Sequence, residues 1–558
     1  MGGLQERLTA MPAARLQGMR RGVEKESLRV DAQGLLATTP HAAALGSALT
    51  HPHITTDFSE SQVELITGVH ASAAACEDEL TRIHQAVYRA IDDERLWVGS
   101  MPCPLPPDDR IPIGRYGSSN VGTAKSVYRT GLGHRYGRRM QTISGIHYNW
   151  SLPGLSNDDH FGLIRNFRRH SFVLLYLFGA SPAVCSSFVE GSPHVLQPLG
   201  VDTMHMPHAT SLRMGRLGYQ SDAQNSLCVS YNGLDGYAAS LNDALTRPYA
   251  AYERIGIRDP DGSYRQLGTT LLQIENEFYG TIRPKRVIFP GERPLHALRE
   301  RGVEYIEVRC MDLDPFVPVG ITAATMRMID LFLLHCLLSD SPLDSPYEIT
   351  SLGRNQQRVA AHGREPGLKL ERGGAEVLLT DWMGEILREC TPIAAHLDAL
   401  ERTDAHARAL ETARQGLASP GTLPSARVLE TMRRGFDGSH AGFVTAQSDA
   451  TRKTLLALPF AAAEADRSAA QAAESIAEQQ RIEAADTMPF EIYRQQYLAP
   501  ERLRLPRGGS VADPMVLAAT AASAPPAAGM PAGAAGLTAA TQGTAMAPAS
   551  TSAPARQA

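Results

Sequence analysis

The sequence predicts a protein of the α+β class, with helices around a sheet that carries charged residues on one face. Short segments in the front part alternate apolar residues with acidic or basic ones, which is the pattern of strands with two different faces. Beyond about residue 330 the apolar spacing becomes helical. Hydrophobic residues make up 43% of the 558 residues and charged residues 20%, so the chain can bury a large core.

Three of the predicted strands lie in the first part of the chain, in the segments RGVEKESLRV, SQVELIT and ISGIHYNW. Each has an apolar and a polar face, because side chains two residues apart in a strand point the same way. The polar faces carry Glu24 and Glu26, then Glu64, then His147 and Asn149. Asp57 lies just before the second of these strands, in the loop-like segment TTDFSES.

Two more strands are predicted in LLQIENEFY and GVEYIEVR. The first sets Gln273, Glu275 and Glu277 against apolar residues, and the second does the same with Glu307 and Arg309. A surface sheet with a solvated outer face would also alternate in this way. Such a face usually carries Lys, Thr and Ser as well, whereas these faces favour Glu, His, Asn, Gln and Arg.

Carboxylates that cluster on one face repel one another unless cations lie between them. Oxygen ligands with one imidazole and no thiolate suit Mg²⁺ or Mn²⁺. Protein-bound Mg²⁺ usually keeps positions for water and for nucleotide phosphates, so the pattern predicts an ATP-dependent enzyme. The chain has no GxxxxGK[ST] loop and no GxGxxG that follows a strand, so the nucleotide site must have another design.

Fixed positive charge for the phosphates has several candidates. Arg309 is the first, because it shares a strand face with Glu307. The others are Arg129, Arg213 and the cluster Arg283, Lys285 and Arg286. The glycine-rich run at residues 115–137 is a candidate lid, and an ordinary long loop would have the same composition.

Several helices have clear signals. Leu80, Ile83, Val87 and Ile91 recur at helical spacing, and the stretch 461–485 has the composition of a long exposed helix. The apolar runs 172–178 and 331–338 are shorter than the ~20 residues of a membrane span and predict buried helices. We expect one catalytic domain over residues 1–507, sheet-rich over 1–330 and helical over 331–507, and a disordered Ala/Pro/Gly-rich tail over 508–558.

Composition excludes several partners. The 54 basic and 59 acidic residues give a net charge of −5, which offers no global positive field to nucleic acid or to an anionic membrane. The N-terminal segment lacks the apolar stretch of a secretory signal, so we expect a cytoplasmic protein. The seven cysteines lie far apart without CxxC spacing, which predicts reduced, mostly buried thiols and argues against a zinc site or disulfides.

Long motifs give the chain a family resemblance. It resembles the proteobacterial type of glutamate–cysteine ligase from about Leu16 to about Tyr497. The matching segments, in order, are RGVEKESLRV, ALGSALTHPHITTDFSESQVELIT, MQTISGIHYNWSLP, LFGASPAVCSSF, ATSLRMGRLGY, LQIENEFYGTIRPKR and GVEYIEVRCMDLDPF. The resemblance implies a glutamine-synthetase-like catalytic core, in which an antiparallel sheet of about six strands forms a funnel with helices outside.

The resemblance also implies roles for individual residues. The metal ligands would be Glu24, Glu26, Asp57, Glu64, His147 and Glu307. Arg129 and Arg309 would contact the phosphates and, together with Glu307, act as catalytic residues. Substrate would be bound by Phe58, Tyr128, Leu132, Gln141, Asn149, Arg213, Tyr219 and Tyr279.

The implied reaction uses ATP and Mg²⁺, or Mn²⁺, to join the γ-carboxylate of L-glutamate to the amine of L-cysteine through γ-glutamyl phosphate. This is the first step of glutathione biosynthesis, and the resemblance implies feedback inhibition by glutathione and a monomeric chain. Two alternatives stay open at this point. One is a related ligase that joins glutamate to another amine, and the other is a non-catalytic module that senses nucleotide or glutathione.

Overall fold

The computed structural model describes residues 3–218, 222–225 and 227–503. Its main sheet has the strand order β2-β3-β1-β5-β10-β9, and the short β4 pairs with β1. Every pairing in this sheet is antiparallel, which confirms the predicted sheet type and fold class. The strands are β1 (Arg20–Val30), β2 (Ile54–Thr56), β3 (Gln62–Ile66), β4 (Arg95–Leu96), β5 (Ile146–Ser151), β9 (Ile282–Lys285) and β10 (Tyr305–Met311).

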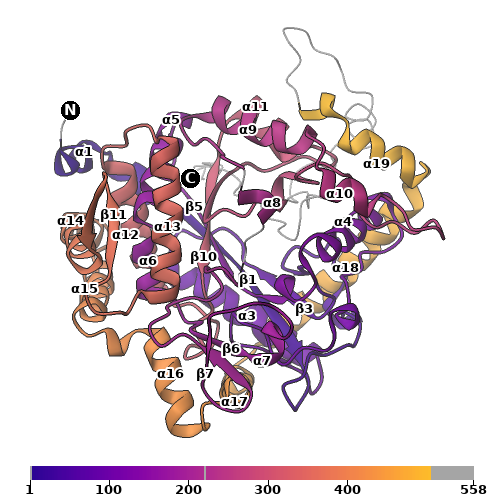
Figure 1. Ribbon diagram of the computed structural model, residues 1–558, viewed down its shortest axis with the longest axis horizontal. Helices are drawn as coiled ribbons and strands as arrows, with labels where there is room; N and C mark the ends of the chain where they lie inside the picture. The colour runs from indigo at the N-terminus through magenta and orange to yellow at the C-terminus, as the bar shows by residue number, and fades with distance from the viewer. Residues whose placement is uncertain (1–2, 219–221, 226, 504–558) are drawn as a thin grey trace, which may run out of the picture.

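Helices surround this sheet on both sides, and the first of them occur in the sheet-rich part of the chain. These are α1 (Leu4–Ala10), α2 (Ala13–Gln17), α3 (Ala73–Ala90), α4 (Asn120–Tyr136), α5 (Asn157–His170), α6 (Phe172–Phe178), α9 (Leu234–Thr246), α10 (Ala250–Ile255) and α11 (Pro294–Arg301). The later helices are α12 (Ala323–Leu338), α13 (Pro346–His362), α14 (Leu379–Glu401), α15 (Ala405–Ala418), α16 (Pro424–Gly435), α17 (His440–Ala457), α18 (Ala462–Ala485) and α19 (Phe490–Leu498). Figure 1 shows α12, α14 and α15 on one side of β10 and α4, α18 and α19 on the other.

Two small sheets and short helices complete the described chain. One sheet joins β6 (Ala183–Cys185), β8 (Thr203–His205) and β7 (Gln197–Pro198), and the other is the hairpin of β11 (Lys369–Arg372) and β12 (Ala375–Leu378). The short helices include α7 (Ser186–Val189) and α8 (Asp222–Asn225).

The apolar face of the main sheet forms the centre of the core. Val23, Val63, Tyr148 and Ile306 come from four neighbouring strands, and each is at most 1% exposed. They belong to one hydrophobic cluster with residues of α3, α5, α6 and α12. Burial of apolar area is the main driving force for folding, so the sheet must turn its charged face to the opposite side.

The helices and cysteines predicted with clear signals are confirmed. The spaced apolar residues lie in α3 or, for Ile91, at its C-cap, the runs 172–178 and 331–338 lie in α6 and α12, and the exposed helix is α18. All seven cysteines are free thiols, of which only Cys228 is exposed. Within the described part of the chain, no helix has the length and apolar character needed to cross a membrane.

The prediction of a strand in LLQIENEFY is wrong. The segment is irregular and contains a short 3₁₀ helix over Glu275–Glu277. A side chain takes the place of a neighbouring strand, because a carboxylate oxygen of Glu277 accepts from the backbone N–H of Gln273 at 2.5 Å. The two carboxylates also have partners, since Glu275 pairs with Arg293 at 2.7 Å and Glu277 with Arg135 at 2.9 Å.

Strand β9 was not predicted, although its residues were noted for their charge. It is an edge strand of the sheet and contains Pro284, which an edge position tolerates because its missing N–H leaves no ladder bond unmade. Its register places Arg283 beside Glu307 and Lys285 beside Tyr305. The basic cluster of the sequence therefore borders the acidic face.

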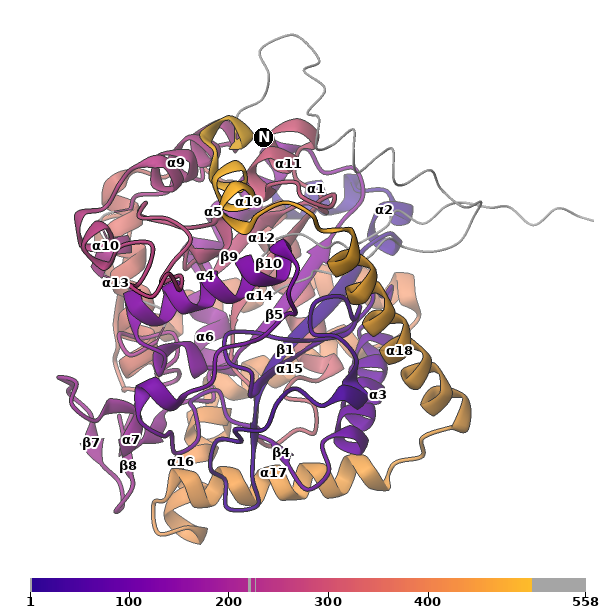
Figure 2. The ribbon, with the colours of Figure 1, turned by 90° about the vertical axis from the view of Figure 1, so that its right-hand side faces the viewer.

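The glycine-rich run is not a loop, and most of it forms α4. Ser119 caps this helix by accepting from the N–H of Gly122 at 3.2 Å. A Cβ atom at Gly122 would lie 2.2 Å from the backbone oxygen of Tyr116, and one at Gly131 would lie 2.6 Å from Gln273. These glycines therefore permit close packing, which composition alone does not distinguish from loop flexibility. Figure 2 shows α4 in front of β10.

Substituting Gly122 by alanine tests this packing role. Alanine normally stabilises a helix relative to glycine by about 0.5–1 kcal/mol. At Gly122 we expect the opposite, a loss of about 1–3 kcal/mol, because the new methyl group would displace backbone. Gly353 in α13 is the matched control, since a Cβ there would meet nothing within 4 Å, and Gly353→Ala should stabilise. Urea unfolding of both variants measures the two signs, and equal stabilisation would contradict the packing role.

Candidate active site

Strand register brings the acidic residues of the charged face together. Glu24 of β1 lies opposite His147 of β5, and Glu26 lies opposite Glu64 of β3. On the far side of β5, Asn149 lies opposite Glu307 of β10. Residues separated by hundreds of positions thus share one face because of the antiparallel pairing.

This face is buried, and part of it lacks partners. Glu24, Glu26, Glu64, His147 and Glu307 are each at most 3% exposed. Neither carboxylate oxygen of Glu64 has a hydrogen-bond partner among the described residues. Ligand atoms of Glu24, Glu64 and His147 all lie within 4.8 Å of one another. Buried carboxylates without partners are costly, so the face is built to hold something positive.

The raised carboxyl pKa values on this face also show that ionised carboxylates are unfavourable there. Burial, and then the charge of Glu307, raises the pKa of Glu24 to about 7. Burial, and then the charge of Asp57, raises the pKa of Glu26 to about 8. The pKa of Glu64 lies well above its ordinary value, again through burial first and neighbouring carboxylates second. A bound cation would remove this cost by favouring the ionised forms.

Glu307 and His147 differ from the other acidic-face residues. Burial works to raise the pKa of Glu307, but Lys285 and Arg309 outweigh it, so that pKa lies well below the ordinary range. Burial and the charge of Arg309 hold the pKa of His147 well below its ordinary value. Its imidazole is therefore neutral and has a lone pair available for a metal ion.

The donor set fits a hard divalent cation. It offers carboxylate oxygens and one neutral imidazole without a thiolate, which suits Mg²⁺ or Mn²⁺. Asp57 lies on the loop after β2, where its charge helps to raise the pKa of Glu26 and where the charge of Arg129 acts to lower the pKa of Asp57 itself. The six residues expected as metal ligands thus lie together, and their roles as ligands stay a prediction.

The raised pKa values predict how the metal-free protein responds to pH. A folded-state pKa above the unfolded value stabilises the fold below about pH 4.5, and that stabilisation is lost as pH rises through the folded pKa of about 7 for Glu24 and about 8 for Glu26. In a chelator, the melting temperature should therefore fall between about pH 6 and about pH 8.5. Mg²⁺ should raise the melting temperature strongly at about pH 8.5, where the carboxylates are ionised, and less at about pH 6. A melting temperature that Mg²⁺ leaves unchanged at both pH values would contradict the metal site.

Fixed positive charge lies on the β10–β9 side of the acidic face. Arg309 donates to a carboxylate oxygen of Glu307 at 2.9 Å, and the ammonium of Lys285 lies 3.2 Å from the other oxygen. Arg283 is 3% exposed and lies opposite Glu307 in the register. Arg286 turns away and donates to the backbone oxygen of Arg301 at 2.6 Å, so it does not belong to the site.

Arg129 approaches the acidic face from α4. Its Nε donates to the backbone oxygen of Asp57, and its guanidinium lies over the ring of Tyr116 at 4.4 Å. Its Nη2 atom is buried and has no hydrogen-bond partner in the described part of the chain. The guanidinium is thus held firmly with one donor group available to an anion.

The described residues expected to bind substrate lie in a cavity, in an apolar cluster and on the acidic face. Arg213, Tyr279 and Arg309 line one cavity of about 200 Å³, and Gln141 donates to the hydroxyl of Tyr279 at 2.9 Å. The apolar members Phe58, Tyr128 and Leu132 lie in a hydrophobic cluster that includes residues of α4. Asn149 is on the acidic face and donates to Glu24 at 2.8 Å. Tyr219 and the expected tail at 508–558 lie outside the described residues.

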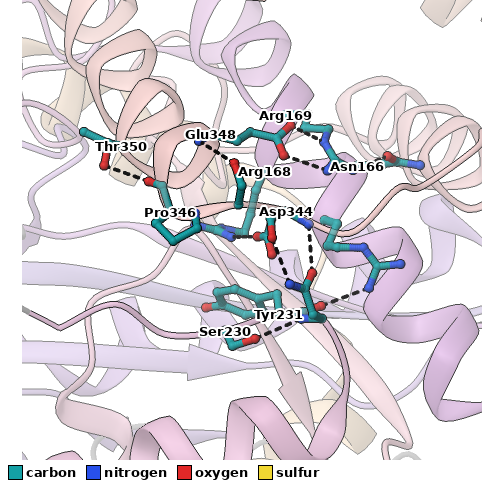
Figure 3. A network of polar contacts seen from close by, with 12 residues as sticks. Asn166, Arg168, Arg169, Ser230, Tyr231, Asp344, Pro346, Glu348 and Thr350 are labelled. Carbon is teal, nitrogen blue, oxygen red and sulfur yellow. Dashed lines mark hydrogen bonds and ion pairs between the residues drawn. The ribbon is translucent and has the colours of Figure 1, made fainter. Parts of the chain in front are cut away.

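One wall of the cavity was not predicted. Arg168 and Tyr231 line it, and the guanidinium of Arg168 lies over the Tyr231 ring at 4.5 Å. Arg168 also pairs with Asp344 at 2.7 Å, and Figure 3 shows this pair within a polar network that joins α5 to the start of α13. No signal in the sequence indicates this wall, because Arg168 lies on a helix and Tyr231 in a loop, and the two segments share no pattern.

Buried carboxylates beside fixed arginines on an open antiparallel sheet are typical of enzymes that act on a metal-bound nucleotide. The sequence profile of the family described as glutamate-cysteine ligase matches residues 6–359. The chain belongs to the glutamate–cysteine ligase family, and it is a ligase.

Individual relatives agree with this family. A glutamate–cysteine ligase of Azotobacter vinelandii is 47% identical over 86% of this chain and 94% of that protein. One of Alcanivorax borkumensis is 46% identical over 88% of this chain and 97% of that protein. A crystal structure of a Francisella tularensis glutamate–cysteine ligase in complex with AMP is 35% identical, with a TM-score of 0.82 over 87% of this chain and 98% of that one.

Proposed function

We propose that the charged sheet face catalyses the ATP-dependent joining of the γ-carboxylate of L-glutamate to the amine of L-cysteine. The observation that carries this proposal is the buried cluster of carboxylates, with both oxygens of Glu64 unpaired among the described residues, next to Arg309 and Lys285. Family membership supports the reaction type, and the AMP-bound relative supports use of a nucleotide. The product, γ-glutamylcysteine, is the precursor of glutathione.

The metal ion in this proposal is Mg²⁺, for which Mn²⁺ could substitute. Its ligands would be Glu24, Glu26, Asp57, Glu64, His147 and Glu307. When bound, such an ion neutralises charge on the phosphates of ATP and favours transfer of the terminal phosphoryl group. The ionised carboxylates, in turn, are stable only with a cation between them, which explains their raised pKa values.

The basic residues act on the phosphoryl group that moves. Phosphoryl transfer depends on positioning and on stabilisation of developing charge, because the protein forms few new covalent bonds in it. Arg309 is anchored to Glu307 at 2.9 Å, so its guanidinium is already oriented, and Arg129 offers its Nη2 group from α4. Transfer to glutamate gives γ-glutamyl phosphate, an activated carboxyl group.

Cysteine then enters through the cavity that Arg213, Tyr279 and Arg309 line. The guanidinium of Arg213 is the partner for a carboxylate, while Gln141 fixes the phenol of Tyr279. The amine attacks the activated carbonyl carbon, a C–N bond forms, and inorganic phosphate leaves. The apolar cluster of Phe58, Tyr128 and Leu132 is proposed to take the small thiol side chain.

We extend the proposal to the domain organisation, oligomeric state, location and inhibition of the enzyme. Residues 1–507 form one catalytic domain, and the chain acts as a monomer in the cytoplasm. Glutathione inhibits it, because product and substrates share the γ-glutamyl and cysteinyl groups. Inhibition that is competitive with glutamate would support this point, and inhibition independent of glutamate concentration would contradict it.

Phosphate release and product analysis test the proposed reaction. Purified protein is incubated with ATP, Mg²⁺ and glutamate, with and without cysteine, and the product is identified by mass spectrometry. We expect cysteine-dependent release of phosphate and one γ-glutamylcysteine for each phosphate. In parallel, 2-aminobutyrate, alanine and bulkier amines replace cysteine; strong preference for one of them would leave the metal site intact and overturn the acceptor. Absence of turnover with every amine would favour a sensing module.

A further inference from the structure

A second cluster of metal-ligating side chains lies among helices that pack behind the sheet. His170 ends α5, His335 and Cys336 lie near the end of α12, and ligand atoms of all three lie within 4.8 Å of one another. Helix α12 contributes to the core on the apolar side of the sheet, so this cluster is separated from the carboxylate face by the sheet itself. The proposed reaction uses none of these three residues.

The histidines are arranged as metal-bound histidines usually are. One ring nitrogen of His335, Nε2, lies 2.7 Å from a carboxylate oxygen of Glu389 on α14. Its other nitrogen, Nδ1, is buried and has no hydrogen-bond partner among the described residues. His335 is only 1% exposed, so bulk solvent does not supply that partner either. A carboxylate that orients one imidazole nitrogen while the other binds the ion is a recurring feature of zinc sites.

His170 has the same kind of available atom. Its Nδ1 is also buried without a hydrogen-bond partner within the described ranges. The ring is positioned by packing, edge-on to Trp382 with centroids 5.8 Å apart and tilted against His335 at 5.6 Å.

We propose that His170, His335 and Cys336 bind a zinc-like divalent ion through two imidazole nitrogens and one thiolate. The Cys336 thiol is the third donor and is fully buried. Nitrogen and sulfur donors favour zinc over Mg²⁺, which separates this site chemically from the carboxylate face. Metal binding breaks the S–H bond of Cys336, forms a sulfur–metal bond and releases one proton to water.

The geometry needs a modest adjustment. Tetrahedral zinc with bonds of about 2.0–2.3 Å places its ligand atoms about 3.5 Å apart. Ligand atoms that lie within 4.8 Å of one another therefore need to close by about 1.3 Å at most, which small changes in side-chain torsions supply. An ion can enter near Glu389, whose side chain is 58% exposed.

A metal ion at this site would link three helices and would take no part in the proposed reaction. His170 comes from α5, His335 and Cys336 come from α12, and Glu389 orients one ligand from α14. An ion that binds only the folded state raises its stability. The cysteine spacing of the sequence could not predict this cluster, because its ligands come from separate helices and include only one thiol.

Cobalt titration of the full-length protein tests the site, with Co²⁺ as the probe and excess Mg²⁺ present to fill the carboxylate face. We expect one equivalent of Co²⁺ to give the thiolate-to-cobalt charge-transfer absorption of a tetrahedral centre. Cys336→Ser should abolish this band. Glu389→Gln, a surface change that leaves all three ligands in place, should weaken Co²⁺ binding about 10- to 100-fold. Cys228→Ser is the matched thiol control and should keep the band, because Cys228 is exposed elsewhere.

Two further measurements keep the proposal testable if Cys336→Ser folds poorly. Zinc should raise the melting temperature of the native protein, and it should do so much less for His170→Ala. Glu64→Gln on the carboxylate face should leave the cobalt band unchanged. A native protein without the charge-transfer band, or a band that survives Cys336→Ser, would overturn the proposal. So would a band that depends on Glu64.

Discussion

Replacing Arg309 by alanine is expected to lower kcat about 10³-fold, the lower end of what an arginine that stabilises a transferring phosphoryl group contributes. The reason is geometric, because Arg309 is fixed by Glu307 at 2.9 Å on the same face as the carboxylates. The change should also free Glu307 from one of its two cationic partners, leaving Lys285 at 3.2 Å. Steady-state kinetics with saturating ATP measures the effect.

Two control variants make the Arg309 result specific. Arg309→Lys keeps the charge but loses the planar fork, so it should recover only part of the lost rate. Arg286→Ala removes a neighbouring arginine that turns toward Arg301, away from the face, and should change kcat less than about twofold. Equal losses in Arg309→Ala and Arg286→Ala would show that general charge, and not the position of Arg309, matters.

Replacing Glu64 by glutamine is expected to have opposite effects on activity and on stability. Activity should fall about 10²- to 10³-fold, the size of effect that loss of one preorganised charge-stabilising group produces. The metal-free protein should become more stable at about pH 8, because glutamine needs no cation in a site where burial holds the pKa of Glu64 well above its ordinary value. Kinetics and thermal unfolding in a chelator measure the two effects on the same preparation.

Glu371→Gln is the matched control for Glu64→Gln. Glu371 lies in β11, outside the main sheet, 15% of its side chain is exposed, and it pairs with Arg354 at 2.5 Å. This substitution should leave kcat unchanged and should not stabilise the protein. If Glu64→Gln instead lowered stability both with and without Mg²⁺, Glu64 would be a structural residue and not a metal ligand.

The sheet was predictable where local pattern and tertiary role agree. Four of the predicted strands carry strict alternation, since one face packs in the core and the other lines the site. Alternation misled in LLQIENEFY, where Glu277 bonds to the backbone of Gln273 and thereby replaces a strand partner. Alternation is a necessary feature of such strands and not a sufficient one.

Helix α4 and strand β9 were not predicted, because tertiary packing determines both of them. In α4, glycines that suggest a loop are required because Gly122 and Gly131 lie against other parts of the chain. Strand β9 contains Pro284, which is acceptable only because that strand ends the sheet. The packing of Gly131 against Gln273 and the edge position of β9 cannot be read from neighbouring residues, because each depends on segments distant in sequence.

The candidate site divides in the same way. Most of its acidic residues lie on strands, so spacing predicted one face for Glu24 and Glu26 and the polar face of another strand for Glu64, and the strand register then joins these faces. The cavity wall of Arg168 and Tyr231 joins a helix to a loop, and no spacing rule connects such residues. Motifs resembling a known family supplied the remaining assignments, and those roles require experiment.

The most direct test of the account is the position of bound metal in a crystal of the protein grown with Mn²⁺ and a non-hydrolysable ATP analogue. Anomalous scattering locates manganese without reference to the protein. The account predicts anomalous peaks between the carboxylates of Glu24 and Glu64 and the imidazole of His147, with the nucleotide phosphates next to Arg309. Manganese and nucleotide bound elsewhere, with the carboxylate face left without metal, would contradict it.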